Sequence, residues 1–340
     1  MERLAYRINR AGSLNNLKLI NENLENPSDD EVTVKIKAIG LNFADVFAIQ
    51  GLYSATPKGS FVPGLEYSGI IINKGGSVTE FEIGEKVMGA IRFGAYADHL
   101  NINKNYILKI PVGWSFEEGA AFIVQSLTAY YSLIELGNIQ ENSTVLIHSA
   151  AGGVGIYANR IAKRFKAFTI GSISNESKFD LLTKEGYDKV IIRGNNFPEK
   201  LRESLNGREL NIVLECIGGK IFLESFRQMS AGGRIIVYGA AQYSTYNPAP
   251  NYFKILTKYL TRPKVDPLSL SDKNKSVMGF NLIYLWDKIE LMKKYLDEIM
   301  KLEIQKPLIG EIFDFKDLLT ALKKFQSGNT IGKIVVNTDH

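Results

Sequence analysis

The chain has 340 residues, of which 45% are hydrophobic and 23% charged, and its formal net charge is +5. That length favours two domains, or one domain inserted into another, and so mild a charge does not favour nucleic acid as a partner. The single cysteine, Cys216, excludes an intramolecular disulfide and any thiolate-rich metal site. The chain starts without the apolar core of a signal peptide, and no apolar stretch is long enough to cross a bilayer, so we expect a cytoplasmic protein.

Up to about residue 120, short apolar runs alternate with glycine-containing turns, which is typical of an irregular β domain. We predict strands at residues 32–40, 68–75, 85–91 and 97–102.

From about residue 125 the pattern changes to apolar strands separated by helix-length segments. The predicted strands are residues 144–149, 167–172, 189–193, 211–217 and 234–239. Strands that alternate with helices in this way form a parallel sheet covered on both faces, so the fold class is α/β. A helix at residues 282–302, and then a helix, a turn and a strand, close the chain.

A glycine-rich turn joins the first of these parallel strands to a helix. Residues 150–155 read AAGGVG, an A-x-G-x-x-G form of the dinucleotide-binding fingerprint. In such a turn Gly152 lets the backbone approach a pyrophosphate, and Gly155 lets the helix pack closely on the strand. The free N–H groups at the helix start attract phosphates. We therefore predict cofactor contacts from Ala151, Gly152, Gly153 and Val154.

The end of the second parallel strand indicates which nicotinamide cofactor binds. An NAD site carries an acidic residue there, whereas residues 171–175 read GSISN and Lys178 follows. Hydroxyls and cations favour the 2′-phosphate of NADPH, so we predict that it contacts Ser172, Ser174, Lys178 and, from the next strand end, Arg193. The alternative is that both cations are solvated surface charges.

Other strand ends extend this predicted site, because ligands of parallel sheets bind at the carboxyl ends of the strands. Cys216 ends the fourth strand, and Gly239 and Ala240 end the fifth, so all three are predicted to line the cofactor site. No base lies beside Cys216 in the sequence, and we expect no nucleophilic role for it.

Motifs along the whole chain resemble a known family. NFADVFAIQGLY (42–53), VPGLEYSG (62–69) and SAAGGVG (149–155) together resemble the quinone-oxidoreductase branch of the medium-chain dehydrogenase/reductase superfamily. MSAGGRIIVYGAAQ, MGFNLIYL and GNTIGKIVV are similar to its VAT-1-like subgroup. The resemblance implies a GroES-like catalytic domain made of residues 1–124 and 266–340. A Rossmann NADP-binding domain, residues 125–265, would be inserted between them, with the cofactor in the cleft.

The resemblance also implies that this chain works without zinc. Zinc-dependent relatives carry a ligand cysteine and a ligand histidine where this chain has Asn42 and Leu65, and Gln125 lies near a further ligand position. A catalytic zinc needs three protein ligands, which these residues do not supply. Glu66, which remains from the motif, is interpreted as structural.

The implied reaction is hydride transfer from NADPH to a quinone or an α,β-unsaturated carbonyl compound. The resemblance places Asn42 and Tyr53 beside the nicotinamide, where both are candidate hydrogen-bond donors to the acceptor's carbonyl oxygen. The alternatives are that Asn42 caps a turn and Tyr53 only packs. Further cofactor contacts implied by the resemblance are Thr128, Phe280, Asn281 and Lys333.

Three other functions remain open on the sequence. One is an enoyl-thioester reductase, and another is an NADPH-binding protein with little turnover. The third is peripheral contact with a membrane, because residues 251–264 carry Lys254, Lys258 and Arg262 at helical spacing among aromatics and without an acid. A solvated helix face would explain the same run. We also expect a homodimer, formed through the edge strand RIIVYGAA.

Overall fold

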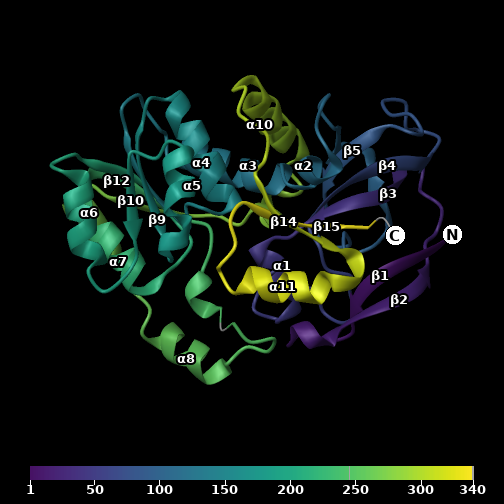
Figure 1. The fold of residues 1–340 in the computed structure, drawn as a ribbon, viewed down its shortest axis with the longest axis horizontal. Helices are drawn as coiled ribbons and strands as arrows, with labels where there is room; N and C mark the ends of the chain where they lie inside the picture. Colours follow the sequence, from purple (N-terminus) through teal and green to yellow (C-terminus); the bar gives the residue numbers. More distant parts are fainter. Residues whose placement is uncertain (245, 339–340) are drawn as a thin grey trace.

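Both ends of the chain contribute to one sheet in the computed structural model, which describes residues 1–244 and 246–338 (Figure 1). The strand order of this sheet is β14-β15-β3-β4-β5-β7, with β6 paired to β3, and β1 and β2 form a separate hairpin. The strands of this domain are β1 (Glu2–Ile8), β2 (Leu17–Asn23), β3 (Glu31–Gly40), β4 (Glu66–Lys74), β5 (Lys86–Ala90), β6 (His99–Asn103), β7 (Ile107–Lys109), β14 (Ile309–Asp314) and β15 (Lys333–Asn337). The helices of this domain are α1 (Phe43–Ile49), α2 (Phe116–Ala120) and α11 (Leu318–Gln326).

A common hydrophobic core explains why the two chain ends meet. On α11, Leu318, Ala321 and Leu322 repeat at helical spacing and are all buried. They share a core with Val34 of β3 and Tyr67 of β4. Burying this apolar stripe on the N-terminal sheet closes the domain, as expected for a GroES-like unit made from both chain ends.

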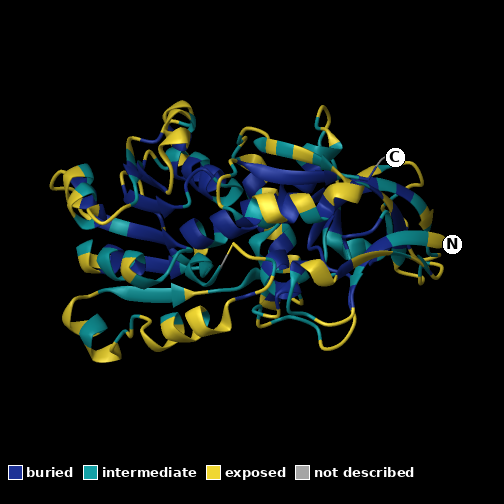
Figure 2. Cartoon of the chain, turned by 60° about the horizontal axis from the view of Figure 1, so that its bottom comes forward, coloured by how far each residue is buried: buried dark blue, intermediate teal, exposed yellow. Residues whose placement is uncertain are grey.

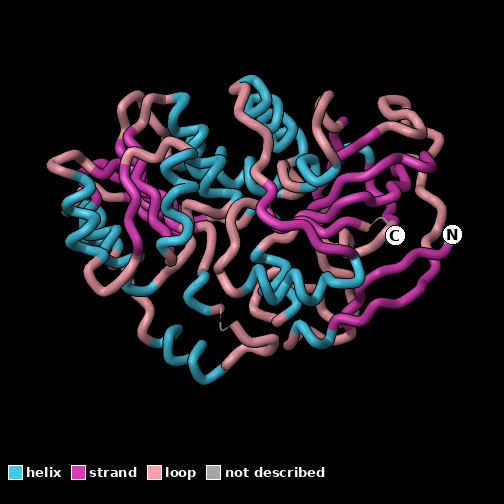
Figure 3. The backbone as a smooth tube through the Cα atoms, viewed as in Figure 1, coloured by secondary structure: helices cyan, strands magenta, loops and turns pink. Residues whose placement is uncertain are grey.

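The middle of the chain forms a second, all-parallel sheet in the order β10-β9-β8-β11-β12-β13. Figure 3 shows the two groups of strands apart, with helices between and around them. The strands are β8 (Thr144–His148), β9 (Phe168–Ile173), β10 (Lys189–Ile192), β11 (Leu210–Glu215), β12 (Met229–Val237) and β13 (Ser276–Gly279). The helices are α3 (Ile123–Tyr130), α4 (Gly153–Arg164), α5 (Phe179–Lys184), α6 (Phe197–Leu205), α7 (Gly219–Gln228), α8 (Tyr252–Leu260), α9 (Pro267–Asp272) and α10 (Ile289–Lys301).

Burial follows the predicted layering of this second sheet. β8 is buried along its whole length, as a strand covered on both faces must be. Figure 2 shows the central strands of both sheets buried, with the exposed residues on the outer helices and loops. Among the helices of the described residues, none is long and apolar enough to cross a membrane.

The structure differs from the sequence-based expectations at the far end of the parallel sheet and in the segment that follows it. β13 pairs in parallel with β12, so β12 is an inner strand and not the edge. The parallel sheet therefore extends past residue 265, the predicted end of the Rossmann domain. β13 has only four residues and no clear apolar alternation, which explains why its pattern gave no signal. The expected helix at 282–302 is likewise a 3-10 turn, η6 (Leu282–Leu285), followed by α10.

Candidate functional site

A cavity of about 1020 Å³ lies at the junction of the two domains. Residues of both sheets line it, and it contains the carboxyl ends of β9, β11 and β12, where ligands of parallel sheets bind. Every site residue predicted from the sequence lines this cavity, except Ser172. They are Asn42, Tyr53, Thr128, Ala151, Gly152, Gly153, Val154, Ser174, Lys178, Arg193, Cys216, Gly239, Ala240, Phe280, Asn281 and Lys333.

The glycine turn forms the floor of the cavity between β8 and α4. Gly152 is the N-cap of α4 and has no side chain to bond the helix's first N–H groups. A Cβ at Gly155 would lie 2.6 Å from the Cα of Ala150, so only glycine permits this helix-to-strand contact. A Cβ at Gly153 would collide with Oε1 of Gln125. No side chain of these glycines therefore covers the backbone of the turn, as a pyrophosphate site requires.

The IGK turn before β15 clamps this floor to the catalytic domain. The N–H of Gly332 donates to the carbonyl of Ala151 at 2.8 Å. Gly332 has a φ of +56°, and a Cβ there would lie 2.4 Å from the carbonyl oxygen of Leu308, so the clamp requires glycine. The next residue, Lys333, consequently enters the cavity beside the glycine turn.

The adenosine end of the cavity, as inferred from the strand ends, carries Lys178 and Arg193. Lys178 is 7% exposed, and its Nζ donates to the carbonyl of Gly328 at 2.6 Å across the domain junction. Burial lowers the pKa of Lys178, and the nearby Arg193 lowers it further. Lys178 and Arg193 repel each other, and among the described residues neither forms an ion pair with a carboxylate in the cavity lining, so an anion bound here is favoured.

Ser172 lies beneath this end and not on the cavity wall. Its side chain is fully buried, and its Oγ lies 3.0 Å from Nδ1 of His148 and accepts from Nη1 of Arg193 at 3.0 Å. The expected direct contact of Ser172 with the cofactor is therefore wrong, because its buried hydroxyl contacts Arg193 instead. Alternation along β9 explains this, because Ser172 and its neighbours face opposite sides of the sheet. His148 itself stays neutral, since burial lowers its pKa to about 3.

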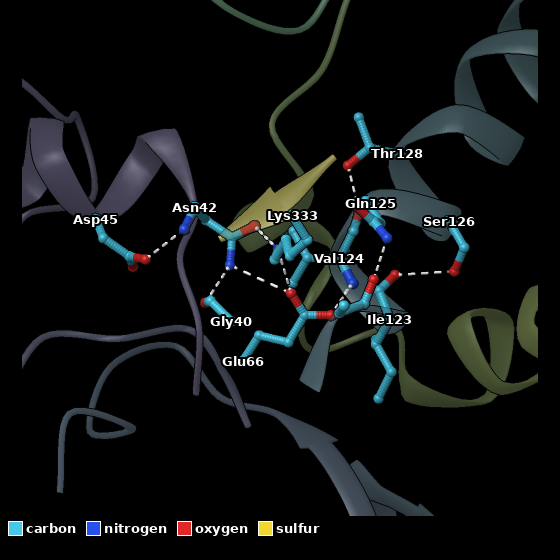
Figure 4. Close-up of polar contacts among 11 residues, drawn as sticks. Gly40, Asn42, Asp45, Glu66, Ile123, Val124, Gln125, Ser126, Thr128 and Lys333 are labelled. Carbon is cyan, nitrogen blue, oxygen red and sulfur yellow. Dashed lines mark hydrogen bonds and ion pairs between the residues drawn. The ribbon is translucent and has the colours of Figure 1, made fainter. Parts of the chain in front are cut away.

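A polar network lies at the opposite end of the cavity, around Asn42 (Figure 4). Nζ of Lys333 contacts Oε2 of Glu66 at 2.6 Å and Oδ1 of Asn42 at 2.7 Å. The other oxygen of Glu66 accepts the N–H of Val124 at 2.9 Å, and Asp45 accepts the N–H of Asn42 at 2.8 Å. Glu66 is thus structural, as expected, and it holds Lys333 in place.

This network fixes the amide of Asn42. Its Nδ2 donates to the carbonyl of Gly40 at 3.2 Å and to Glu66 at 3.3 Å, while its Oδ1 accepts from Lys333. Both amide hydrogens therefore already point at protein acceptors. Asn42 also precedes α1 as its N-cap. A substrate oxygen would have to compete with Gly40 or Glu66 for a donor here, so direct donation by Asn42 stays a prediction.

Tyr53 and Asn281 meet across the cavity. The hydroxyl of Tyr53, in the loop after α1, donates to Oδ1 of Asn281 at 2.7 Å. Burial raises the pKa of Tyr53 to about 12, so the phenol keeps its proton at neutral pH. Because Tyr53 belongs to the catalytic domain and Asn281 follows β13, this hydrogen bond joins the two domains.

The remaining predicted residues lie where the sequence placed them along the cavity. Oγ1 of Thr128 donates to the carbonyl of Val124 within α3, which leaves its oxygen free to accept. A Cβ at Gly239 would lie 2.9 Å from Cβ of Cys216, so glycine lets these strand ends approach. Burial raises the pKa of the Cys216 thiol, which disfavours the reactive thiolate. The ring of Phe280 packs 4.9 Å from that of Tyr131.

Sequence reasoning missed several polar residues of the cavity, among them Ser149, Lys254 and Lys258. Ser149, directly after β8, has a φ of +52°, a strained conformation that no sequence pattern indicated. Lys254 and Lys258 of α8 also line the cavity, although their spacing had been assigned to a lipid or solvent face. The i, i+4 spacing was the available signal, but it does not say which way the face points.

The part of the cavity away from the glycine turn is largely apolar. Ile91 and Tyr106 of the catalytic domain face Ile283, Trp286 and Met292 of the η6–α10 segment. The rings of Tyr106 and Trp286 stack at 4.4 Å with an interplanar angle of 7°. Such a wall suits an apolar acceptor and excludes water from it.

Comparison with known proteins agrees with this architecture. The profile of the family "Alcohol dehydrogenase GroES-like domain" matches residues 28–112, and that of "Zinc-binding dehydrogenase" matches residues 153–298. The synaptic vesicle membrane protein VAT-1 homolog of Danio rerio is 34% identical over 313 residues, which are 91% of this chain and 64% of that protein. The human VAT-1 homolog-like protein is 28% identical over 334 residues, 96% of this chain and 79% of its own length.

Solved structures show the same fold. The crystal structure of the human VAT-1 homolog-like protein has a TM-score of 0.85 at 26% identity and covers 100% of this chain and 99% of its own. Escherichia coli quinone oxidoreductase, solved with NADPH, has a TM-score of 0.84 at 24% identity and covers 99% of this chain and 100% of its own. At that identity the second likeness shows the fold alone.

The GroES-like sheet and the parallel sheet define a two-domain fold with a cavity at the domain junction, and the glycine turn lines that cavity. The chain belongs to the medium-chain dehydrogenase/reductase superfamily, and over most of its length it is similar to VAT-1 homologs. It spans 64% of the length of the Danio rerio relative.

Proposed function

We propose that this chain is an NADPH-dependent reductase that transfers a hydride to a quinone or an α,β-unsaturated carbonyl compound without zinc. The charge of the cavity carries this proposal. Its described lining contains no aspartate or glutamate, and it contains the cations Lys178, Arg193, Lys254, Lys258, Lys293 and Lys333. The 2′-phosphate of NADPH carries a charge of about −1.5 to −2 near neutral pH, and a pyrophosphate adds more. A lining without acids fits this cofactor, with Lys178, Arg193, Lys254 and Lys258 as its cations, because Glu66 compensates Lys333 and Glu290 lies near Lys293.

The residues present also fit the shape of the cofactor. Bare backbone at Gly152 and Gly153 suits the pyrophosphate, and the buried cations Lys178 and Arg193 suit a 2′-phosphate. When bound, NADPH supplies a hydride from its nicotinamide ring. The chain itself must orient the acceptor, keep water out and stabilise negative charge on the acceptor's carbonyl oxygen.

Tyr53 is the residue best placed to stabilise that charge. Its raised pKa keeps the hydroxyl protonated, and only the single hydrogen bond to Asn281 has to be exchanged for one to the acceptor. Lys333 and Glu66 hold Asn42 in one orientation beside it. The apolar wall around Trp286 then confines the acceptor.

The absence of zinc from the proposed reaction rests on the residues at the ligand positions. Leu65 has no donor atom, and the side chain of Gln125 donates to the carbonyl of Ala121. No group of three or more His, Cys, Asp or Glu side chains in the described part of the chain is arranged to hold a metal ion. The "Zinc-binding dehydrogenase" name of the matched family is therefore not carried over to this chain.

A turnover screen tests the proposal directly. NADPH oxidation would be followed with quinones, 2-alkenals and enoyl thioesters, and we expect turnover with the first two classes. Tyr53→Phe should lower kcat about 10- to 1,000-fold if it loses the donor to the developing oxyanion. Tyr252→Phe, on the exposed face of α8, should leave kcat unchanged. Tight NADPH binding without turnover on any acceptor would contradict the reductase and favour a non-catalytic role.

Enoyl thioesters are the second candidate substrates. The CurK enoyl reductase structure shares the fold, with a TM-score of 0.84 at 24% identity. The additional cations Lys254 and Lys258 at the cavity favour a phosphate-bearing substrate such as a coenzyme A thioester. A kcat/KM higher for enoyl thioesters than for quinones in the same screen would select this candidate.

A peripheral membrane contact is proposed for the outer face of α8. Tyr252, Phe253, Leu256 and Leu260 are each more than half exposed there. Lys254 and Lys258 line the cavity, and Arg262 stacks on Tyr259, so the cations expected to meet lipid headgroups are largely turned elsewhere. This contact would therefore rest on apolar insertion. Flotation with vesicles of neutral phosphatidylcholine, lost in Phe253→Ser, would support it, and no flotation of wild type would refute it.

A further inference from the structure

Helix α8 connects β12 to β13 yet packs on neither domain core. None of its residues is buried, and in Figure 1 it lies outside both domain bodies, at the end of long connections. Asn251 caps it, accepting the N–H of Lys254 at 3.0 Å. The helix is thus well formed but held by few contacts.

One face of α8 nevertheless lines the cavity. Lys254, Ile255, Lys258 and Tyr259 follow helical spacing and all belong to the lining. Nζ of Lys258 donates to the carbonyl of Gln242, whose side chain in turn lies against Gly218 and Gly219 after β11. This contact fixes α8 beside the strand end that carries Cys216, on the nucleotide side of the cavity.

The two lysines on this face lack acidic partners. Lys254 and Lys258 form no ion pair with a carboxylate in the part of the chain that the structure describes, and the cavity lining there has no acid. Burial lowers the pKa of Lys258, and Lys254 lowers it further, so the two ammonium groups repel each other. An anion between them would remove this repulsion.

We propose that α8 is a cationic wall that binds a phosphate group of the ligand in the cavity through Lys254 and Lys258. The inference rests on the proposed NADPH site. The phosphate is either the 2′-phosphate of the cofactor or a phosphate of a coenzyme A thioester substrate, because both have the same chemistry. Because few contacts hold α8, a phosphate bound between its two lysines should protect the amides of the helix.

Ligand pairs that differ in their phosphates test this proposal. The first pair is 2′,5′-ADP and 5′-AMP, which differ by the 2′-phosphate alone, with affinities measured by calorimetry. The double variant Lys254→Ala/Lys258→Ala should weaken 2′,5′-ADP about 5- to 50-fold and leave 5′-AMP nearly unchanged. The matched control is Arg262→Ala, which removes a cation next to the same helix but outside the cavity, and it should change neither affinity.

The second pair separates the two sources of the phosphate. If the double variant keeps its affinity for 2′,5′-ADP but raises KM for enoyl-coenzyme A and not for enoyl-pantetheine, the phosphate belongs to the substrate. Hydrogen exchange gives an independent readout: the phosphate-bearing member of the affected pair should slow exchange of the amides of residues 252–260 in wild type only. No change in either pair would overturn the role of α8.

The failure of this inference and that of the proposed function are distinguishable. Wild type that does not bind 2′,5′-ADP would contradict the NADPH site itself. If wild type binds 2′,5′-ADP and the double variant binds it equally tightly, only the role of α8 in binding the cofactor is contradicted. Because α8 contains no buried residue, the variants should melt at the wild-type temperature, which a thermal scan checks.

Discussion

Lys333 and Glu66 form a buried ion pair, with 2.6 Å between Nζ and Oε2, although 267 positions separate them in the sequence. They are the first residues of β15 and β4, two strands that lie on either side of β3. Glu66 also accepts the N–H of Val124 in α3, and Lys333 follows the Gly332 clamp on the nucleotide turn. This ion pair thus connects the sheet of the GroES-like domain to the glycine turn at residues 150–155, the proposed pyrophosphate site.

Removing one member of this pair should strongly destabilise the protein. Glu66→Ala leaves the ammonium of Lys333 buried without compensation, and we expect a loss of about 3–5 kcal/mol in the free energy of unfolding. Urea denaturation measures it. The control is Glu290→Ala, because Glu290 is 84% exposed and lies 3.6 Å from Lys293, and the expected change there is under about 1 kcal/mol. Equal losses for both variants would contradict the structural role of Glu66.

Asp45 should make stability depend on pH. Burial raises its pKa from 3.8 to about 7, so the folded protein binds a proton that the unfolded chain releases near pH 4. The free energy of unfolding should therefore fall as pH rises from about 4 to about 7, by about 2–4 kcal/mol from this group. Asp45→Asn should remove this part of the slope, as urea titrations at successive pH values would show.

Two observations check the assignment of that slope to Asp45. Asp287→Asn alters a carboxylate that is 77% exposed, and it should retain the wild-type pH dependence. The groups that act on Asp45 are Glu66, Lys333 and Tyr96. An unchanged slope in Asp45→Asn would contradict this assignment.

Lys178 should distinguish NADPH from NADH. Lys178→Met keeps the buried stem but removes the charge, and it should weaken NADPH about 10- to 100-fold while leaving NADH nearly unchanged. Arg193→Ala should have a smaller and non-additive effect, because both cations would share one phosphate. Fluorescence titration of both cofactors measures these affinities.

The control for Lys178 is Lys184, the last residue of the helix that Lys178 caps. Lys184→Ala removes an exposed cation of α5 and should change neither affinity. A parallel loss of NADH and NADPH in Lys178→Met would instead assign Lys178 to the domain junction, through its bond to Gly328. A wild-type preference for NADH would contradict the cofactor assignment.

The proposed homodimer should form through the open edge of β13. The N–H of Phe280 points to β12, so by alternation that of Val277 points to the open edge. Val277→Pro should therefore abolish strand pairing between two copies while sparing the pairing with β12. Light scattering should show a dimer for wild type and for Val277→Thr, and a monomer for Val277→Pro. Wild type that is monomeric at micromolar concentration would refute the dimer.

Local pattern determined much of this protein. The alternation of strands with helices, the AAGGVG turn and the absence of an acid after β9 are all short-range features, and they led to the fold, the cleft and the residues of its lining. Such features can be predicted because backbone geometry and periodicity act over a few residues. The sites of Gly152, Lys178 and Arg193 follow from them directly.

Tertiary structure alone decided which distant residues meet and which way a side chain faces. Nothing near Asn42 in the sequence indicates that Lys333 and Glu66 hold its amide. Helical spacing put Lys254 and Lys258 on one face of α8, but only packing turned that face to the cavity. Likewise, β13 became the edge strand because it pairs with β12. Long-range burial and charge compensation make these choices, and they depend on contacts that no local pattern contains.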